Sequence, residues 1–391
     1  MANPEDQEHL RLLLPNFLSA RECKELEFIH KSNCTVGYRP NVFSTTLSHL
    51  IATNCAHLIM PFVPIRERLK EKVEEFFGCE YELFVEFTGL ISWSRGASIG
   101  WHSDDNRPYL KQRHFAAVCY LNNYGDDFKG GRFHFQDGDL ATIVPSSGDV
   151  VIYTADSRNT HSVDEVTGGE RLTMALWFSR DAAHDEDAKL ITLLSRTPLS
   201  NKSPELLLPL PASSNMYWFS LDHASSDDQF GFDICCARLH VLGYDVVYSD
   251  EKISCSNIPE LLIERLRLAR GDELFDYEFV NILHALQVVQ FYCWKTSDLK
   301  FAQVESTIKV VPLSQSQRDK SLRLKSESLK DRHLAESVFS SEGAKHSHWA
   351  QLTVAVAMWG DYVHRLHKEL VICLPHWNSH QSIFHLSFDD K

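Results

Sequence analysis

Short alternating runs of apolar and polar residues, separated by glycine-rich turns, are the feature that most constrains the fold of this chain. Residues 131–136 (Gly-Arg-Phe-His-Phe-Gln) and 171–178 (Arg-Leu-Thr-Met-Ala-Leu-Trp-Phe) have period two, and residues 115–122 and 149–154 are rich in strand formers. This pattern predicts strands whose alternate residues face opposite sides. Several such strands at regular spacing predict a sandwich or barrel of the jelly-roll type.

Helices are expected on both sides of these strands. Ser19-Ala20-Arg21-Glu22 fits a capping box, with Leu18 in the staple position before it. This motif predicts the start of a helix. The hydrophobic pattern predicts further helices over residues 66–77, 258–270, 279–294 and 349–370.

The composition divides the chain into two parts. Residues 197–215 are rich in Pro, Ser and Leu, which indicates a linker. We therefore expect an N-terminal domain over residues 1–196, with its core at about residues 85–181, and a mainly helical region of unknown role over residues 216–391. Within that region, residues 314–345 are rich in Ser, Lys and Arg and predict a flexible insertion. The expected class is α+β, a jelly roll (double-stranded β-helix) with supporting N-terminal helices.

Charge and composition disfavour several classes of protein. The 39 basic and 53 acidic residues give 39 − 53 = −14, which disfavours binding to nucleic acid or to an anionic membrane surface. The sequence has no run of about 18 apolar residues, the length that a membrane helix needs. It also shows no signal peptide, so a cytoplasmic or nuclear protein is expected. The ten cysteines include no C-x-x-C pair, which disfavours a zinc ribbon.

One motif carries candidate chemistry. In His102-Ser103-Asp104, the histidine and the aspartate point to the same side if the segment is a strand. His161 lies before the alternating run at residues 171–178 and offers a second imidazole. Two imidazoles and one carboxylate on one face of a metal, with the opposite face open, are the ligands of non-haem Fe(II) oxygenases.

The run at residues 171–178 offers a site for an anion beside this metal. Arg171 and Thr173 share one face of the run. A buried guanidinium is suited to hold the distal carboxylate of a 2-oxo acid as a bidentate pair, and the Thr173 hydroxyl can donate one further hydrogen bond. Tyr120 can reach the same carboxylate, although a strand tyrosine is equally suited to packing.

The residues alone leave two interpretations open. With twenty histidines, about one H-x-D is expected by chance, and residues 104–108 themselves resemble a surface turn. The iron site and the turn therefore stay equally weighted at this point. Two rival dyads, His184-x-Glu186 and His367-x-Glu369, are interpreted as surface charges at helix ends.

Five landmarks then follow one another in a recognisable order. They are Tyr120-Leu121-Asn122, Gly130-Gly131-x-Phe133-x-Phe135, His161-x-Val163, Gly169-x-Arg171 and Ala175-Leu176-Trp177-Phe178. This order resembles the catalytic domain of prolyl hydroxylases, most closely that of leprecan-type prolyl 3-hydroxylases. The resemblance implies that residues 1–196 form a dioxygenase domain in which His102, Asp104 and His161 bind Fe(II) and Arg171 anchors 2-oxoglutarate.

The resemblance also implies a reaction and partners. O₂ is the second co-substrate, succinate and CO₂ are released, L-ascorbate is a further cofactor, and the substrate is a protein or peptide hydroxylated at proline. Trp93 lies near the place where prolyl hydroxylases often have a tyrosine that lines the co-substrate pocket, and is equally suited to the core. The resemblance by itself would place the protein in the endoplasmic reticulum. A lysyl or small-molecule hydroxylase and a non-catalytic binding scaffold remain the alternatives.

Overall fold

The structure is a computed structural model that describes residues 9–196 except 34 and 54, five positions between 287 and 295, and residues 349–386. The chain forms two compact units. The first comprises Met1–Glu27, Arg39–Ser200 and Leu366–Lys391, and the second comprises Phe28–Tyr38 and Asn201–Arg365. The expected linker, the helix over residues 258–270 and the polar stretch at residues 314–345 lie outside the described residues, as does most of the helix over residues 279–294.

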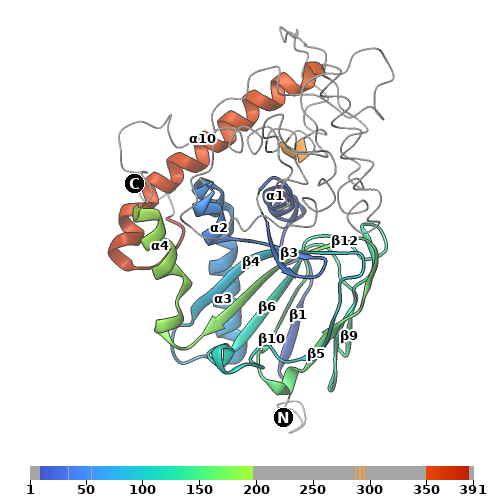
Figure 1. Ribbon diagram of the computed structural model, residues 1–391. Helices are drawn as coiled ribbons and strands as arrows, with labels where there is room; N and C mark the ends of the chain where they lie inside the picture. Colours follow the sequence, from blue (N-terminus) through green and yellow to red (C-terminus); the bar gives the residue numbers. More distant parts are fainter. Residues whose placement is uncertain are drawn as a thin grey trace, which may run out of the picture. The chain divides into compact units, whose positions relative to one another are not determined.

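Two antiparallel sheets form the core of the first unit (Figure 1). The larger sheet has the order β1 (Arg11–Leu14), β10 (Val150–Thr154), β6 (Phe115–Tyr120), β12 (Val166–Ser179), β4 (Phe84–Ser94) and β3 (Val42–Thr46), with β7 (Phe128–Gly130) paired to β12. The smaller sheet has the order β5 (Ile99–His102), β11 (His161–Val163), β8 (Phe133–Phe135) and β9 (Thr142–Ile143). β2 (Val36–Arg39) lies where the two units meet along the chain. The expected α+β jelly-roll class is confirmed.

The described helices are α1 (Ala20–Lys31), α2 (Leu47–Ala52), α3 (Val63–Phe77), α4 (Glu186–Arg196) and α10 (Trp349–His380). α1 begins where the capping box predicts and α3 matches the expected helix over residues 66–77, but α10 ends at His380 and not at residue 370. α2 and α4 were not predicted. The capping box at the start of α1 is formed, because the Glu22 amide donates to Ser19 Oγ (3.2 Å) and the Ser19 amide donates to Glu22 Oε2 (2.8 Å). None of the described helices combines the length and apolar character that crossing a membrane requires.

The period of two on β12 assigns its residues to two different environments. Ala175 and Trp177 belong to buried clusters on the inner face of the larger sheet, and one of these clusters includes Phe133 and Phe135 of the smaller sheet. The outer face carries helices, as Phe77 at the end of α3 shows by stacking on Phe115 of β6 with ring centroids 4.3 Å apart. The space between the two sheets therefore receives Arg171 and Thr173, which share the phase of Ala175.

A buried ion network joins α3, α4 and β4. Arg66 is 2% exposed, and its guanidinium contacts Asp187 (2.6 Å), Glu186 (3.4 Å) and the Thr88 hydroxyl (3.0 Å). Asp187 also accepts a hydrogen bond from the Ile383 amide (2.8 Å). Glu186 is only 8% exposed, so its interpretation as a surface charge was wrong. The sequence pattern did not show this burial, because the partner of Glu186 is Arg66, which lies 120 residues away in the sequence.

This network predicts a pH dependence of stability. Burial raises the pKa of Glu186 from its ordinary 4.5 to about 7, and Arg66 only partly opposes this shift. The folded protein therefore holds a proton that the unfolded chain releases, and this stabilisation is lost as the pH rises from about 5 through 7. We expect Glu186→Gln to remove up to about 3 kcal/mol of that pH dependence.

Urea unfolding at pH 5, 6, 7 and 8 measures the effect. Glu71→Gln, which changes an exposed glutamate on α3, the helix that carries Arg66, is the matched control and should follow the wild type. Parallel stability curves for wild type and Glu186→Gln would contradict the account.

Candidate active site

The pairing of β5 with β11 brings three candidate metal ligands together. His161 lies opposite His102 in this pair, and their ring centroids are 4.3 Å apart. Asp104 follows the end of β5, where the amide of Asp105 donates to the carbonyl of Ala155 (3.1 Å) and holds the segment against the loop after β10. One ligand atom from each of the three residues lies within 4.8 Å of the others. Among the residues that the structure describes, this is the only such group, and neither rival dyad belongs to one.

Both imidazoles are oriented by main-chain carbonyls. His102 Nδ1 lies 2.8 Å from the carbonyl oxygen of Gly100, and His161 Nδ1 lies 3.0 Å from that of Asn159. Each Nδ1–H donates to its carbonyl, so each Nε2 keeps its lone pair for a metal. Burial, and then the neighbouring His161, lower the pKa of His102, which favours the neutral form that binds metals.

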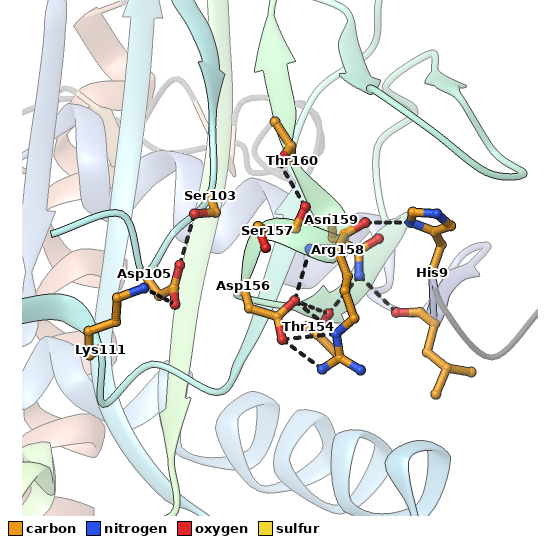
Figure 2. A network of polar contacts seen from close by, with 11 residues as sticks. His9, Ser103, Asp105, Lys111, Thr154, Asp156, Ser157, Arg158, Asn159 and Thr160 are labelled. Atoms are coloured by element: carbon orange, nitrogen blue, oxygen red, sulfur yellow. Dashed lines mark hydrogen bonds and ion pairs between the residues drawn. The ribbon is translucent and has the colours of Figure 1, made fainter.

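The loop that leads into His161 is held by its own polar network (Figure 2). The Asn159 amide group donates to Thr154 Oγ1 (2.8 Å) and to the carbonyl of Leu10 (3.1 Å), and Asn159 is 1% exposed. Asp156 accepts from the Arg158 amide (3.1 Å). Asn159 therefore fixes both the end of β10 and the carbonyl that orients His161.

Arg171 is a buried cation between the sheets. It is 2% exposed, and its guanidinium carbon lies 5.4 Å and 5.5 Å from the ring centroids of Tyr120 and Trp93. Burial lowers its pKa from the ordinary value. Within the described part of the chain no carboxylate pairs with it, and its Nε has no hydrogen-bond partner. Since buried charges are normally paired, the arrangement fits an anionic ligand.

The other predicted co-substrate residues lie around Arg171. Trp93 pairs with Arg171 across β4 and β12, and Tyr120 pairs with Thr173 across β6 and β12. The Trp93 Nε1 and the Tyr120 hydroxyl are buried and lack hydrogen-bond partners among the described residues. Burial raises the pKa of Tyr120 to about 12, so its hydroxyl remains a donor. The Thr173 hydroxyl donates to the carbonyl of Ile91 (3.3 Å).

Sequence reasoning missed two residues of this region. Gly131, which stands in one of the sequence landmarks, has a φ of +63°, and a Cβ added there would lie 3.0 Å from Arg171 Cδ. Tyr153 on β10 donates a hydrogen bond to Asp104 Oδ2 (2.9 Å). Neither belongs to a ligand motif, and only the Gly130-Gly131 pair signalled an unusual backbone.

Comparison with known proteins agrees with this geometry. Residues 88–179, which contain all three candidate ligands and Arg171, match the model of the 2OG-Fe(II) oxygenase superfamily. The chain contains a 2OG-Fe(II) oxygenase domain.

Relatives of this oxygenase domain include prolyl 3-hydroxylases. Prolyl 3-hydroxylase 1 of Gallus gallus is 27% identical over 236 residues, which are 48% of this chain and 32% of that protein. Prolyl 3-hydroxylase 1 of Mus musculus is 38% identical over 217 residues, 45% of this chain and 29% of that protein. The match thus spans less than a third of these two relatives. The resemblance to this family is confirmed.

Solved structures are also similar to the chain. A prolyl-4-hydroxylase of Pseudomonas putida is 17% identical and covers 46% of this chain and 96% of its own, with a TM-score of 0.37.

Arg66 and Arg171, which are each 2% exposed in the oxygenase unit, predict opposite effects on stability. Arg171→Met removes an unpaired buried charge, and we expect it to raise the free energy of unfolding of the ligand-free protein by about 1 kcal/mol or more. Arg66→Met leaves Glu186 and Asp187 buried without their cation and should cost about 3–5 kcal/mol. Urea unfolding in chelator without 2-oxoglutarate measures both values. An equal fall in the free energy of unfolding in both variants would contradict this, because it would show that the charge of Arg171 is compensated within the protein.

Proposed function

We propose that this chain is an Fe(II)- and 2-oxoglutarate-dependent dioxygenase that hydroxylates a peptidyl residue, proline first. One observation carries the proposal: the two imidazoles and the carboxylate form a cluster in the same first unit in which the inner face of the larger sheet buries an unpaired guanidinium. A cation site beside an anion site is what a co-substrate that bridges a metal and an arginine requires.

The chain's own residues then have separate roles. His102, Asp104 and His161 would hold Fe(II), and Arg171 would hold the distal carboxylate of 2-oxoglutarate as a bidentate pair. Tyr120 and Trp93 would offer their unpartnered hydroxyl and indole N–H to the same co-substrate, and Thr173 would line its pocket. Bound Fe(II) supplies the oxidising chemistry, in which O₂ converts 2-oxoglutarate to succinate and CO₂ and hydroxylates the substrate.

The two sheets also exclude water from this region. Phe133, Phe135 and Trp177 are buried in the cluster that surrounds Tyr120. A dry environment strengthens the attraction between Arg171 and a carboxylate, because few water dipoles screen the charges. The exclusion of water also limits side reactions.

The relatives support the choice of substrate. Proteins named prolyl 3-hydroxylase match this chain over about 45% of its length, so a peptidyl proline is the substrate that we propose. L-Ascorbate would sustain turnover as an added reductant. A hydroxylase of lysyl residues or small molecules would use the same metal ligands but would need a substrate-binding cleft of a different shape.

The test is a reaction on a peptide mixture. Purified protein is incubated with Fe(II), 2-oxoglutarate, ascorbate and a proteome digest, and mass spectrometry measures succinate and peptides that gain one oxygen atom. We expect oxygen on prolyl residues with wild type and none with His102→Ala, since a metal ligand is lost. Equal yields from the two proteins, or no iron-dependent succinate, would refute the dioxygenase. Oxygen on lysine alone would refute the proline assignment.

Gly131 provides an independent prediction about the anchor. A side chain at Gly131 would press on Arg171 Cδ at 3.0 Å and would be strained at φ +63°, so Gly131→Ala should displace the guanidinium. We expect the dissociation constant of 2-oxoglutarate to rise about tenfold or more, or about 1.4 kcal/mol, in calorimetric titrations with Mn(II) replacing Fe(II). Gly168→Ala is the matched control, because nothing lies within 4 Å of an added Cβ there. Equal 2-oxoglutarate affinities in both variants would remove Gly131 from this role.

A further inference from the structure

The two carboxylate oxygens of Asp104 have different surroundings. Oδ1 lies 3.9 Å from His161 Nε2 and faces the imidazoles, while Oδ2 accepts a hydrogen bond of 2.9 Å from the Tyr153 hydroxyl. Asp104 is 8% exposed, so little water can replace this donor. One oxygen is therefore free to bind a metal, and the other is already occupied.

Tyr153 is buried in the hydrophobic core of the first unit. It is 1% exposed, and its ring packs edge-on against Phe135 and His161, with centroid separations of 5.3 Å and 5.1 Å. Among the residues that the structure describes, its hydroxyl contacts Asp104 and, at 3.5 Å, His161 Nε2. The ring would pack equally well as phenylalanine, because the neighbouring Phe133 and Phe135 already form such contacts. Packing therefore does not explain the hydroxyl.

We propose that Tyr153 is a positioning residue that makes Asp104 a one-oxygen ligand. A carboxylate with two free oxygens can bind a metal through both and occupy two positions. The Tyr153 hydroxyl holds Oδ2 away, so only Oδ1 is offered, and one more position stays open for co-substrate and O₂. The inference rests on the proposed function, because it takes the cluster of His102, Asp104 and His161 as the metal site.

Anaerobic titration with Co(II), whose visible spectrum reports coordination, tests this role. Tyr153→Phe removes only the hydroxyl, and we expect about 10- to 100-fold weaker Co(II) binding together with a changed visible spectrum. Ser92→Ala is the matched control: it removes a buried hydroxyl on β4 of the larger sheet that has no partner among the described residues. Its Co(II) affinity and spectrum should equal those of the wild type.

A third variant separates the two hypotheses. Asp104→Ala should bind Co(II) far more weakly than Tyr153→Phe, because a ligand is lost. If Asp104→Ala binds Co(II) as the wild type does, the metal site itself is wrong. If Asp104→Ala loses binding while Tyr153→Phe keeps the wild-type affinity and spectrum, only the role of Tyr153 fails. A fall in unfolding free energy with an unchanged spectrum would likewise reduce Tyr153 to a packing residue.

Discussion

The register between β5 and β11 is the constraint on which the site depends. In an antiparallel pair, residues directly opposite have their Cβ atoms about 4.5–5.5 Å apart, and a slip of one residue turns a side chain to the other face. His102 and His161 occupy one such pair, and the register shifts immediately after it. The separation of the two imidazoles is thus a property of the sheet. Asp104 completes the group because the segment after β5 is tied to the loop after β10.

The larger sheet contributes the second part of the site, the buried positive charge of Arg171. A comparison of Arg66 and Arg171, which are each 2% exposed, shows how such a charge can be compensated. Arg66 meets two carboxylates and the Thr88 hydroxyl, whereas Arg171 faces the rings of Tyr120 and Trp93 and no carboxylate among the described residues. Destabilising features of a folded protein, such as an unpaired buried charge, often mark functional sites. Arg171 has this feature, and an anion bound from solution would neutralise its charge.

Much of the architecture could be predicted because its signals are local. Period two marks β8 and β12, runs of strand formers mark β6 and β10, and the Ser19–Glu22 box marks the start of α1. The three candidate ligands could be proposed from the H-x-D spacing together with an ordered set of landmarks, although β5 ends at His102 and Asp104 lies in the turn that follows it. Contacts between distant residues could not be predicted. Tyr153 and Asp104 are 49 residues apart, and Arg66 and Glu186 are 120 apart, so no local pattern joins them. Gly131 shows an unusual backbone in sequence, but only the fold shows that it makes room for Arg171.

A crystal structure of the protein grown with Mn(II) and 2-oxoglutarate tests the central claim most directly. The anomalous signal locates the metal, and the difference density locates the co-substrate. The account predicts Mn(II) bonded to Nε2 of His102, Nε2 of His161 and one oxygen of Asp104. It also predicts that the distal carboxylate of 2-oxoglutarate lies against the Arg171 guanidinium. Metal bound elsewhere, or 2-oxoglutarate bound without contact to Arg171, would contradict it.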